Sequence, residues 1–191
     1  MIQLFSRTSL AVIALLIPVH ALAADAAPPA SFFDQWFANA QGGTPCYGRS
    51  FDDAHLNAHT KQLVRRIEID MTKSNASGIA NTAERFELGF GLMLAKSAEW
   101  YGQAAICKSS EASADCFLEG DGGRFKLTPM PDGALKLETG DYGIALEGAS
   151  DTIALSGSDG DDRVFLLKAA RDECDAAAAF FKSDTDKPGA E

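Results

Sequence analysis

Two histidines, His55 and His59, stand four residues apart, and Asp52 precedes the first of them by three residues. If the chain makes a helical turn here, both imidazole rings share one face and the Asp52 carboxylate can join them. Zinc and copper accept such ligands. The spacing therefore predicts a metal site of His55, His59 and Asp52 as one hypothesis for the function. The alternative is that the rings cap a turn or bond backbone carbonyls, since two histidines alone make a weak site and further ligands would have to come from elsewhere.

Patterns typical of catalytic sites are weaker in this sequence than the histidine spacing. A hydrolase triad would need one of these same histidines, and no G-x-S-x-G elbow accompanies them. A pair of catalytic carboxylates cannot be chosen from the 27 acidic residues without geometry. An enzyme of unrecognised type is therefore a second alternative, with no catalytic residue assigned. No cofactor is expected apart from zinc or copper in the metal hypothesis.

A cluster of acids, Asp159, Asp161 and Asp162, resembles a calcium loop in composition only. The spaced ligand pattern and the closing glutamate of such a loop are absent. The Ser-Asp-Gly-Asp stretch at residues 158–161 instead has the chemistry of a turn. We expect these acids to lie at a hairpin tip in solvent.

Four cysteines allow three disulfide pairings. Cys107 and Cys116 flank a predicted hairpin and are expected to pair, which leaves Cys46 to pair with Cys174. No C-x2-C spacing is present, and this argues against a zinc cluster of cysteines. Two structural disulfides indicate an oxidising compartment.

Residues 1–23 have the pattern of a secretory signal peptide. Arg7 precedes an apolar stretch at residues 10–19, and residues 21–23 (Ala-Leu-Ala) offer a cleavage site. The apolar stretch would make about 15 Å of helix, which is too short for a hydrocarbon core of about 30 Å. We therefore expect export to the periplasm, a soluble product and no transmembrane segment.

Charge limits the partners. The chain has 17 basic and 27 acidic residues, a formal net charge of −10. A surface that binds nucleic acid needs a basic stripe, and none is evident, so no nucleic-acid partner is expected. An acidic surface would attract a basic protein instead.

A short amphipathic helix is predicted after a flexible lead-in at residues 24–30. Ser31 and Asp34 have the spacing of a capping box, and Gly42 follows the helix as a stop signal. Its aromatic residues fall at helical spacing and are expected to plug the open end of a sheet or barrel. These residues are Phe32, Phe33, Trp36 and Phe37.

From Cys46 onward the hydrophobic period changes to two, most clearly over residues 86–94. Asp-Gly and Gly-Asp turns separate about eight to ten such runs. The prediction is a mainly β domain over residues 31–182: a single antiparallel up-and-down meander that closes fully or partly into a barrel. A two-sheet sandwich is the alternative. A short C-terminal helix around residues 174–181 and a disordered tail at residues 183–191 complete the chain.

The size, export signal and strand number are similar to those of small exported barrels such as lipocalin-like carriers and periplasmic lysozyme inhibitors. No inhibitor motif can be carried over residue by residue, so the similarity concerns the fold alone. The leading hypothesis is an exported, non-catalytic binding protein. In an inhibitor-like version a loop enters the cleft of a basic enzyme. In a carrier-like version Phe90, Leu92 and Trp100 line a cavity for a small apolar ligand.

Overall fold

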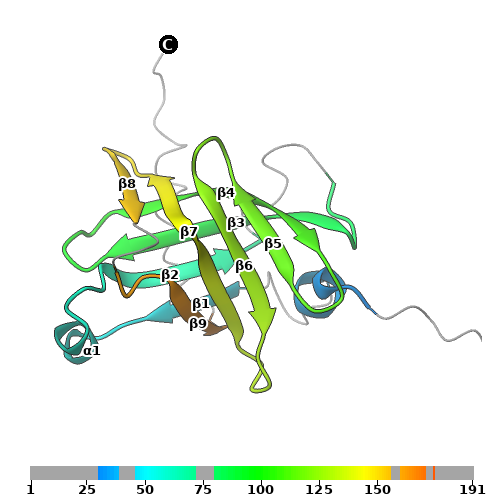
Figure 1. Cartoon of the computed structure of the whole chain (residues 1–191), viewed down its shortest axis with the longest axis horizontal. Coiled ribbons are helices and arrows are strands. Elements are labelled where there is room, and N and C mark those ends of the chain that lie inside the picture. The colour runs from blue at the N-terminus through cyan, green and yellow to red at the C-terminus, as the bar shows by residue number, and fades with distance from the viewer. Residues whose placement is uncertain (1–29, 39–45, 72–79, 156–159, 171–173, 175–191) are drawn as a thin grey trace, which may run out of the picture.

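The structure is a computed structural model, and it describes residues 30–38, 46–71, 80–155, 160–170 and Cys174. Nine antiparallel strands form one sheet around a common core (Figure 1). Their bounds are β1 (Cys46–Ser50), β2 (Val64–Asp70), β3 (Arg85–Leu94), β4 (Trp100–Ser109), β5 (Ala114–Leu118), β6 (Gly123–Pro129), β7 (Leu135–Glu147), β8 (Thr152–Leu155) and β9 (Val164–Ala169). No helix among the described residues is long and apolar enough to cross a membrane.

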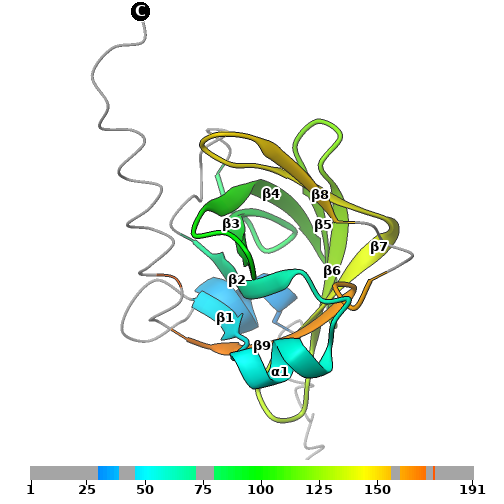
Figure 2. The ribbon, with the colours of Figure 1, turned by 90° about the vertical axis from the view of Figure 1, so that its left-hand side faces the viewer.

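The sheet closes into a barrel. Its strand order is β6-β5-β4-β3-β2-β1-β9-β7-β8, and a further pairing of β6 with β7 completes a ring of eight strands (Figure 2). Closure leaves few free strand edges, which is why it stabilises a meander of short strands. The predicted antiparallel barrel is confirmed.

Strand β7 departs from a simple up-and-down order. Its first half pairs with β6 and β9, whereas its second half pairs with β8 and, at Ile144, with Gly123 of β6. The second half also lies against β4, where Tyr101 bridges Gly148 and the Gln103 side chain donates to the Ala145 carbonyl at 3.1 Å. One long strand therefore joins the ring at one end and carries an extra hairpin at the other.

Apolar side chains fill the barrel. Alternate residues of each strand point inward, and the ring centroids of Phe90 and Phe125 lie 5.0 Å apart. Each fully buried Phe or Leu contributes about 1.5–3 kcal/mol. The largest fully buried side chains are Phe32, Phe86, Phe90, Phe165, Ile67, Ile69, Leu88, Leu92, Leu127, Leu135, Leu137 and Leu146.

Trp100 does not line this interior, contrary to the expectation from the sequence. Leu92 of β3 pairs with Tyr101, and Met93 pairs with Trp100. Because neighbouring residues on a strand face opposite sides, Tyr101 points inward with Leu92 and Trp100 points outward. The indole lies under the guanidinium of Arg66, whose Cζ is 5.3 Å from the ring centroid.

The N-terminal helix is confirmed as a short π-helix, η1 (Asp34–Ala38). Ser31 Oγ donates to Asp34 Oδ2 at 2.8 Å, and the Asp34 N–H donates back to Ser31 Oγ at 3.1 Å, as a capping pair does. Phe32 and Phe37 are buried against Phe86 at the start of β3. This end of the barrel is therefore plugged by aromatic rings, as predicted.

Both predicted disulfides are confirmed. Cys107 and Cys116 are cross-strand neighbours on β4 and β5 and lie inside the core. Cys46 of β1 bonds to Cys174 across a sequence separation of 128 residues. The predicted signal peptide, the lead-in up to residue 29, the tail and the C-terminal helix apart from Cys174 lie outside the described residues.

Candidate functional site

The two histidines lie on a short helix, α1 (Asp53–Ala58), between β1 and β2. The carboxylate of Asp52 caps it and accepts a hydrogen bond from the His55 N–H at 2.8 Å. His59 is the C-cap, and its N–H donates to the His55 carbonyl at 3.0 Å. The imidazole rings stack with centroids 4.3 Å apart. The helical turn thus brings both rings to one face, while the Asp52 carboxylate accepts a hydrogen bond from the helix backbone.

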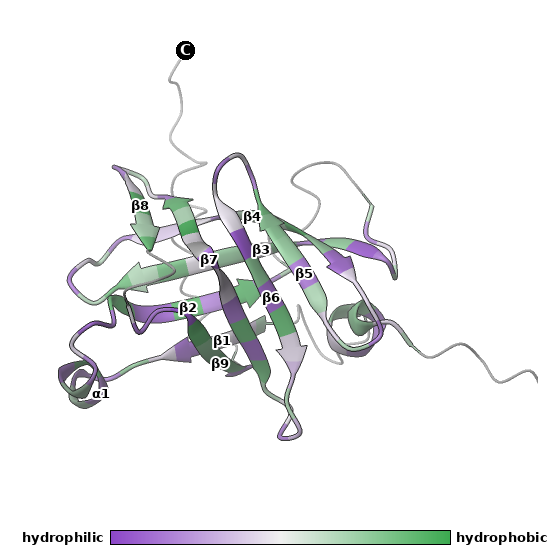
Figure 3. Cartoon of the chain, viewed as in Figure 1, coloured by the Kyte–Doolittle hydropathy of each residue, from purple (hydrophilic) through white to green (hydrophobic). Residues whose placement is uncertain are grey.

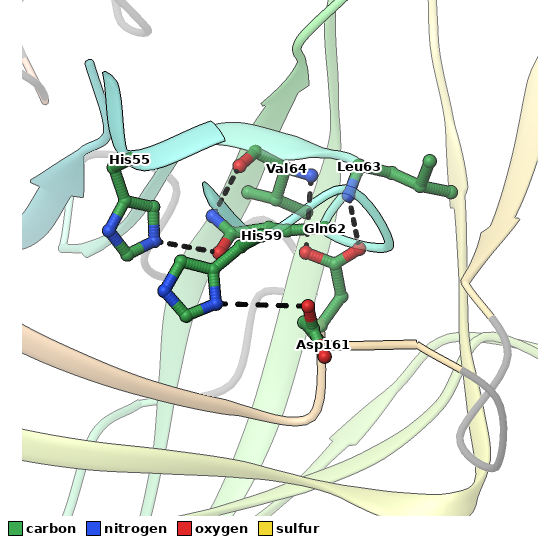
Figure 4. Close-up of polar contacts among 7 residues, drawn as sticks. His55, His59, Gln62, Leu63, Val64 and Asp161 are labelled. Carbon is green, nitrogen blue, oxygen red and sulfur yellow. Dashed lines mark hydrogen bonds and ion pairs between the residues drawn. The ribbon is translucent and has the colours of Figure 1, made fainter. Parts of the chain in front are cut away.

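The stacked histidines have protein partners (Figure 4). His55 Nε2 lies 3.0 Å from Gln62 Oε1, and the Gln62 amide donates in turn to the Val64 carbonyl at 2.8 Å. His59 Nδ1 lies 3.8 Å from an oxygen of Asp161. One nitrogen of each ring is therefore already directed at a partner, and no sequence spacing pointed to Gln62 or Asp161.

Asp161 is close to His59, but among the described residues it does not form a group with both histidines in which all three ligand atoms lie within 4.8 Å of one another. Among them, one group of three metal-binding side chains has its ligand atoms within 4.8 Å of one another, and it consists of Cys46, Glu68 and Cys174. Its two sulfurs are joined in a disulfide and cannot act as thiolate ligands. The metal hypothesis for His55, His59 and Asp52 stays a prediction.

Asp162 is not at a solvent-facing tip, as the sequence suggested, but is only 3% exposed. Its carboxylate accepts hydrogen bonds from the Leu63 N–H at 2.6 Å and the Val64 N–H at 3.1 Å. Asp161 beside it is exposed. Asp162 therefore joins the segment before β9 to the start of β2, a contact between residues about a hundred positions apart that local sequence patterns cannot reveal.

Replacing Asp162 with asparagine should lower the free energy of unfolding by about 1–3 kcal/mol, because the amide has one acceptor oxygen for two backbone donors. Burial raises the pKa of Asp162 above 3.8, aided by the charge of Asp161 and opposed by the two N–H donors. The native state thus keeps the proton at a higher pH than the unfolded chain does. The contribution of Asp162 to stability is full below pH 3.8 and decreases as the pH rises through its native pKa. Urea denaturation should therefore show that the difference in unfolding free energy between the wild type and Asp162→Asn becomes smaller as the pH rises through the native pKa. A difference that grows with pH would contradict this prediction.

A groove of about 450 Å³ lies on the outer face of β4, β5, β6 and β7. Outward and inward residues alternate along these strands, and Figure 3 shows the resulting polar and apolar bands on β5 and β6. The outward side chains at the groove are Lys108, Asp115, Phe117, Arg124, Lys126 and Glu138.

Phe117 is the unusual residue of the groove, because it is an aromatic side chain that is 43% exposed. It pairs across the strands with Ile106 on one side and Arg124 on the other. Gly140 of the neighbouring strand β7 lies beside Arg124, and a Cβ at Gly140 would be 3.4 Å from Arg124 Cγ. The absence of a side chain at Gly140 therefore keeps the groove open beside a phenyl ring and a guanidinium.

The rest of the groove carries charges of alternating sign. Lys108, Asp115, Lys126 and Glu138 are successive cross-strand partners. Glu138 Oε2 lies 2.8 Å from the ammonium of Lys136, which offsets its charge. A row of this kind commonly forms a solvated face, but Arg124 has no carboxylate partner within ion-pair distance among the described residues. Locally, positive charge exceeds negative charge.

This groove was not predicted from the sequence. The pairing of Cys107 with Cys116 inside the barrel implies that Phe117 points outward, since neighbours on a strand alternate. This alternation was the feature of the sequence that could have indicated an exposed Phe117. Outward Val164 (52% exposed) and Leu166 (41% exposed) of β9 extend the apolar character of the same outer surface.

A second pocket, of about 430 Å³, lies beside the turn between β5 and β6. Glu119, Asp121 and Glu147 line it without a basic residue. The Gly122 N–H donates to the Glu119 carbonyl, and the Gly122 carbonyl accepts from the Ala145 N–H, both at 3.0 Å. The acidic turn is therefore held in place by one backbone bond within the turn and one to β7.

Known proteins give no guide to which of these sites is used. Comparison with models of protein families, with curated proteins and with solved structures finds no match for this chain.

Proposed function

We propose that this protein is an exported, non-catalytic binding protein that recognises its partner on the outer surface of the barrel, at the groove around Phe117. The observation that carries the proposal is the exposed Phe117 ring beside Arg124, on a barrel whose interior is packed with side chains. Aromatic residues and arginine are enriched in protein interfaces, and arginine is also enriched among the few residues that carry most of the binding energy. The carrier-like version, in which a small apolar ligand binds inside the barrel, stays a prediction.

The groove suits a partner segment that offers an apolar side chain to Phe117 and a carboxylate to Arg124. Guanidinium and carboxylate form paired hydrogen bonds, which fix orientation as well as add energy. The net charge of −10 alone would favour a basic partner. At contact the local charge dominates, because charges more than about 8 Å away are screened at physiological salt.

Export is part of the proposal, and its support is the leader pattern at residues 1–23 together with the two disulfides. Mass spectrometry of the protein from the periplasmic fraction should find the chain processed after Ala23, with no free thiol. An unprocessed chain in the cytoplasm would reject this part.

The double variant Phe117→Ala/Arg124→Ala should weaken partner binding by about 2 kcal/mol or more, roughly 30-fold in Kd. The partner would be captured by cross-linking in an envelope extract and then titrated against each purified variant. Leu63→Ala is the matched control, because Leu63 is 51% exposed but lies at the start of β2, away from the groove. Equal affinity of all three proteins would reject the groove.

The inhibitor-like version of this proposal depends on the acidic turn between β5 and β6 instead of the groove. If a rigid loop enters the cleft of a basic enzyme, Glu119 and Asp121 are the residues in place to do it. Preorganised loops bind with a smaller loss of conformational entropy. A basic lysozyme titrated with the protein should lose activity, and the Glu119→Gln/Asp121→Asn variant should not inhibit. Full enzyme activity at micromolar protein would exclude this version.

A metal-binding function for His55 and His59 is the second candidate, favoured by the stacking of the two rings at 4.3 Å. Zinc or copper would have to replace the contacts with Gln62 and Asp161 or use the opposite ring nitrogens. Calorimetry with each metal should show binding that His55→Ala/His59→Ala abolishes. Identical binding by the double variant would assign the metal to another place.

A further inference from the structure

A row of four charged side chains crosses the outer face of β4, β5, β6 and β7, strands that lie side by side (Figure 1). Each strand gives one residue, and the charges follow in the order plus, minus, plus, minus: Lys108, Asp115, Lys126 and Glu138. All four line the groove around Phe117. Lys108, Asp115 and Lys126 take part in none of the ion pairs between described residues. These charges are therefore available to a partner.

The order of the charges is self-complementary. A two-fold axis parallel to the strands, between β5 and β6, turns the row of a second copy end to end. Lys108 then faces the partner's Glu138, and Asp115 faces the partner's Lys126. Because a two-fold axis repeats every contact, the two rows make four pairs of opposite charge. The order plus, minus, minus, plus would instead bring like charges together.

The same axis brings the two Phe117 rings together. Phe117 and Arg124 are cross-strand partners on β5 and β6, and the axis passes between these strands. Phe117 therefore lies beside the partner's Phe117 and opposite the partner's Arg124, whose guanidinium can lie over the ring. The partner's Asp115 is two residues from its Phe117 on the same strand. A second copy thus offers an apolar side chain to Phe117 and a carboxylate to Arg124.

The contact is small, because four neighbouring strands span only about 14 Å. Interfaces that bury less than about 1,200 Å² belong to weak or transient complexes. The net charge of −10 on each chain also opposes association at a distance. Charges farther than about 8 Å from the contact are screened at physiological salt, so the paired rows dominate there. A dimer in rapid exchange with the monomer is the expected form.

We propose that the groove around Phe117 binds the same groove of a second copy of this chain, as a two-fold dimer held by the paired charge rows and the two phenyl rings. The inference rests on the proposed function, because it names the partner at that site. An acidic segment of another protein is the competing occupant. Since both would use Phe117 and Arg124, the dimer and a complex with another protein exclude each other.

Sedimentation of the purified, oxidised protein measures the association without any other protein present. We expect a monomer–dimer equilibrium with a Kd on the order of 10 µM, which weakens as salt is added. Phe117→Ala/Arg124→Ala should abolish the dimer. A wild-type protein that stays monomeric at about 100 µM would overturn the inference. A different protein captured at the groove would then be the occupant, and the proposed function would stand.

Charge reversal tests the pairing itself. Lys108→Glu places like charges opposite each other at both ends of the row and should raise the Kd at least about tenfold. Lys108→Glu/Glu138→Lys reverses both ends and should restore the Kd to within about threefold of the wild type, because opposite charges face each other again. Lys96→Glu is the matched control, since Lys96 is exposed in the turn after β3, at the far end of the strand from Arg85 and Lys108.

A dimer that Lys108→Glu leaves unchanged, or that the double reversal does not restore, would overturn the inference. The proposed function fails by a separate result, which is a partner from the envelope extract that binds wild type and Phe117→Ala/Arg124→Ala equally well.

Discussion

The Cys46→Ala/Cys174→Ala variant should lose about 5 kcal/mol of unfolding free energy, the largest effect expected of any pair of substitutions considered for this barrel. The disulfide closes a loop with a sequence separation of 128 residues. In the chain-entropy model a loop of this length restricts the unfolded state by about that amount. Because small domains have total stabilities of about 5–15 kcal/mol, the variant should be close to unfolded at 37 °C. Guanidinium denaturation with circular dichroism measures the change.

The second disulfide provides the comparison. Cys107 and Cys116 are separated by 9 residues, so their removal should cost about 2–3 kcal/mol. Both sulfurs are buried, and alanine also removes their packing contacts. Dithiothreitol added to the wild-type protein reduces both disulfides without creating a cavity, so it measures the combined loss of stability. Equal losses from the two alanine pairs would show that loop closure is not the main source of the stabilisation.

Much of the fold could be predicted from the sequence because it depends on local patterns. The period-two run over residues 86–94 becomes β3, and Ser31 with Asp34 caps η1 as its spacing indicates. The disulfide pairing followed from the hairpin between β4 and β5. The behaviour of β7 could not be predicted, since its division between β9 and β8 depends on how the ring closes.

The candidate sites were also predictable only where they depend on local sequence patterns. The four-residue spacing of His55 and His59 correctly placed both rings on one face of a helical turn. Their contacts with Gln62 and Asp161 depend on tertiary structure. Trp100 was assigned to the wrong side, because a strand's register decides its inward set and a shift of one residue reverses it. Phe117 was missed for a related reason, since its exposure depends on which face Cys116 occupies.

Replacing Gly123 with alanine should destabilise the barrel by about 3 kcal/mol, from backbone strain and close contact together. Gly123 has φ of +87°, which residues with a side chain rarely adopt. An added Cβ would also lie 2.5 Å from the Gly143 carbonyl oxygen, a backbone atom that cannot rotate away. This is the place where β6 meets the second half of β7, as Gly123 pairs with Ile144 after a shift in register.

Gly133 separates the two contributions. It has a similar φ of +81° in the turn before β7, but a Cβ there would meet nothing within 4 Å. Gly133→Ala should therefore cost only the backbone strain, about 1–2 kcal/mol. If urea denaturation finds the two variants equally stable, close approach of β6 and β7 is not what Gly123 provides. A larger loss at Gly123 would mean that the register shift between β6 and β7 depends on a backbone contact that leaves no room for a side chain. The same register shift sets Arg124 opposite residues 140–143 of β7, where the missing side chain of Gly140 leaves the space beside Arg124 open.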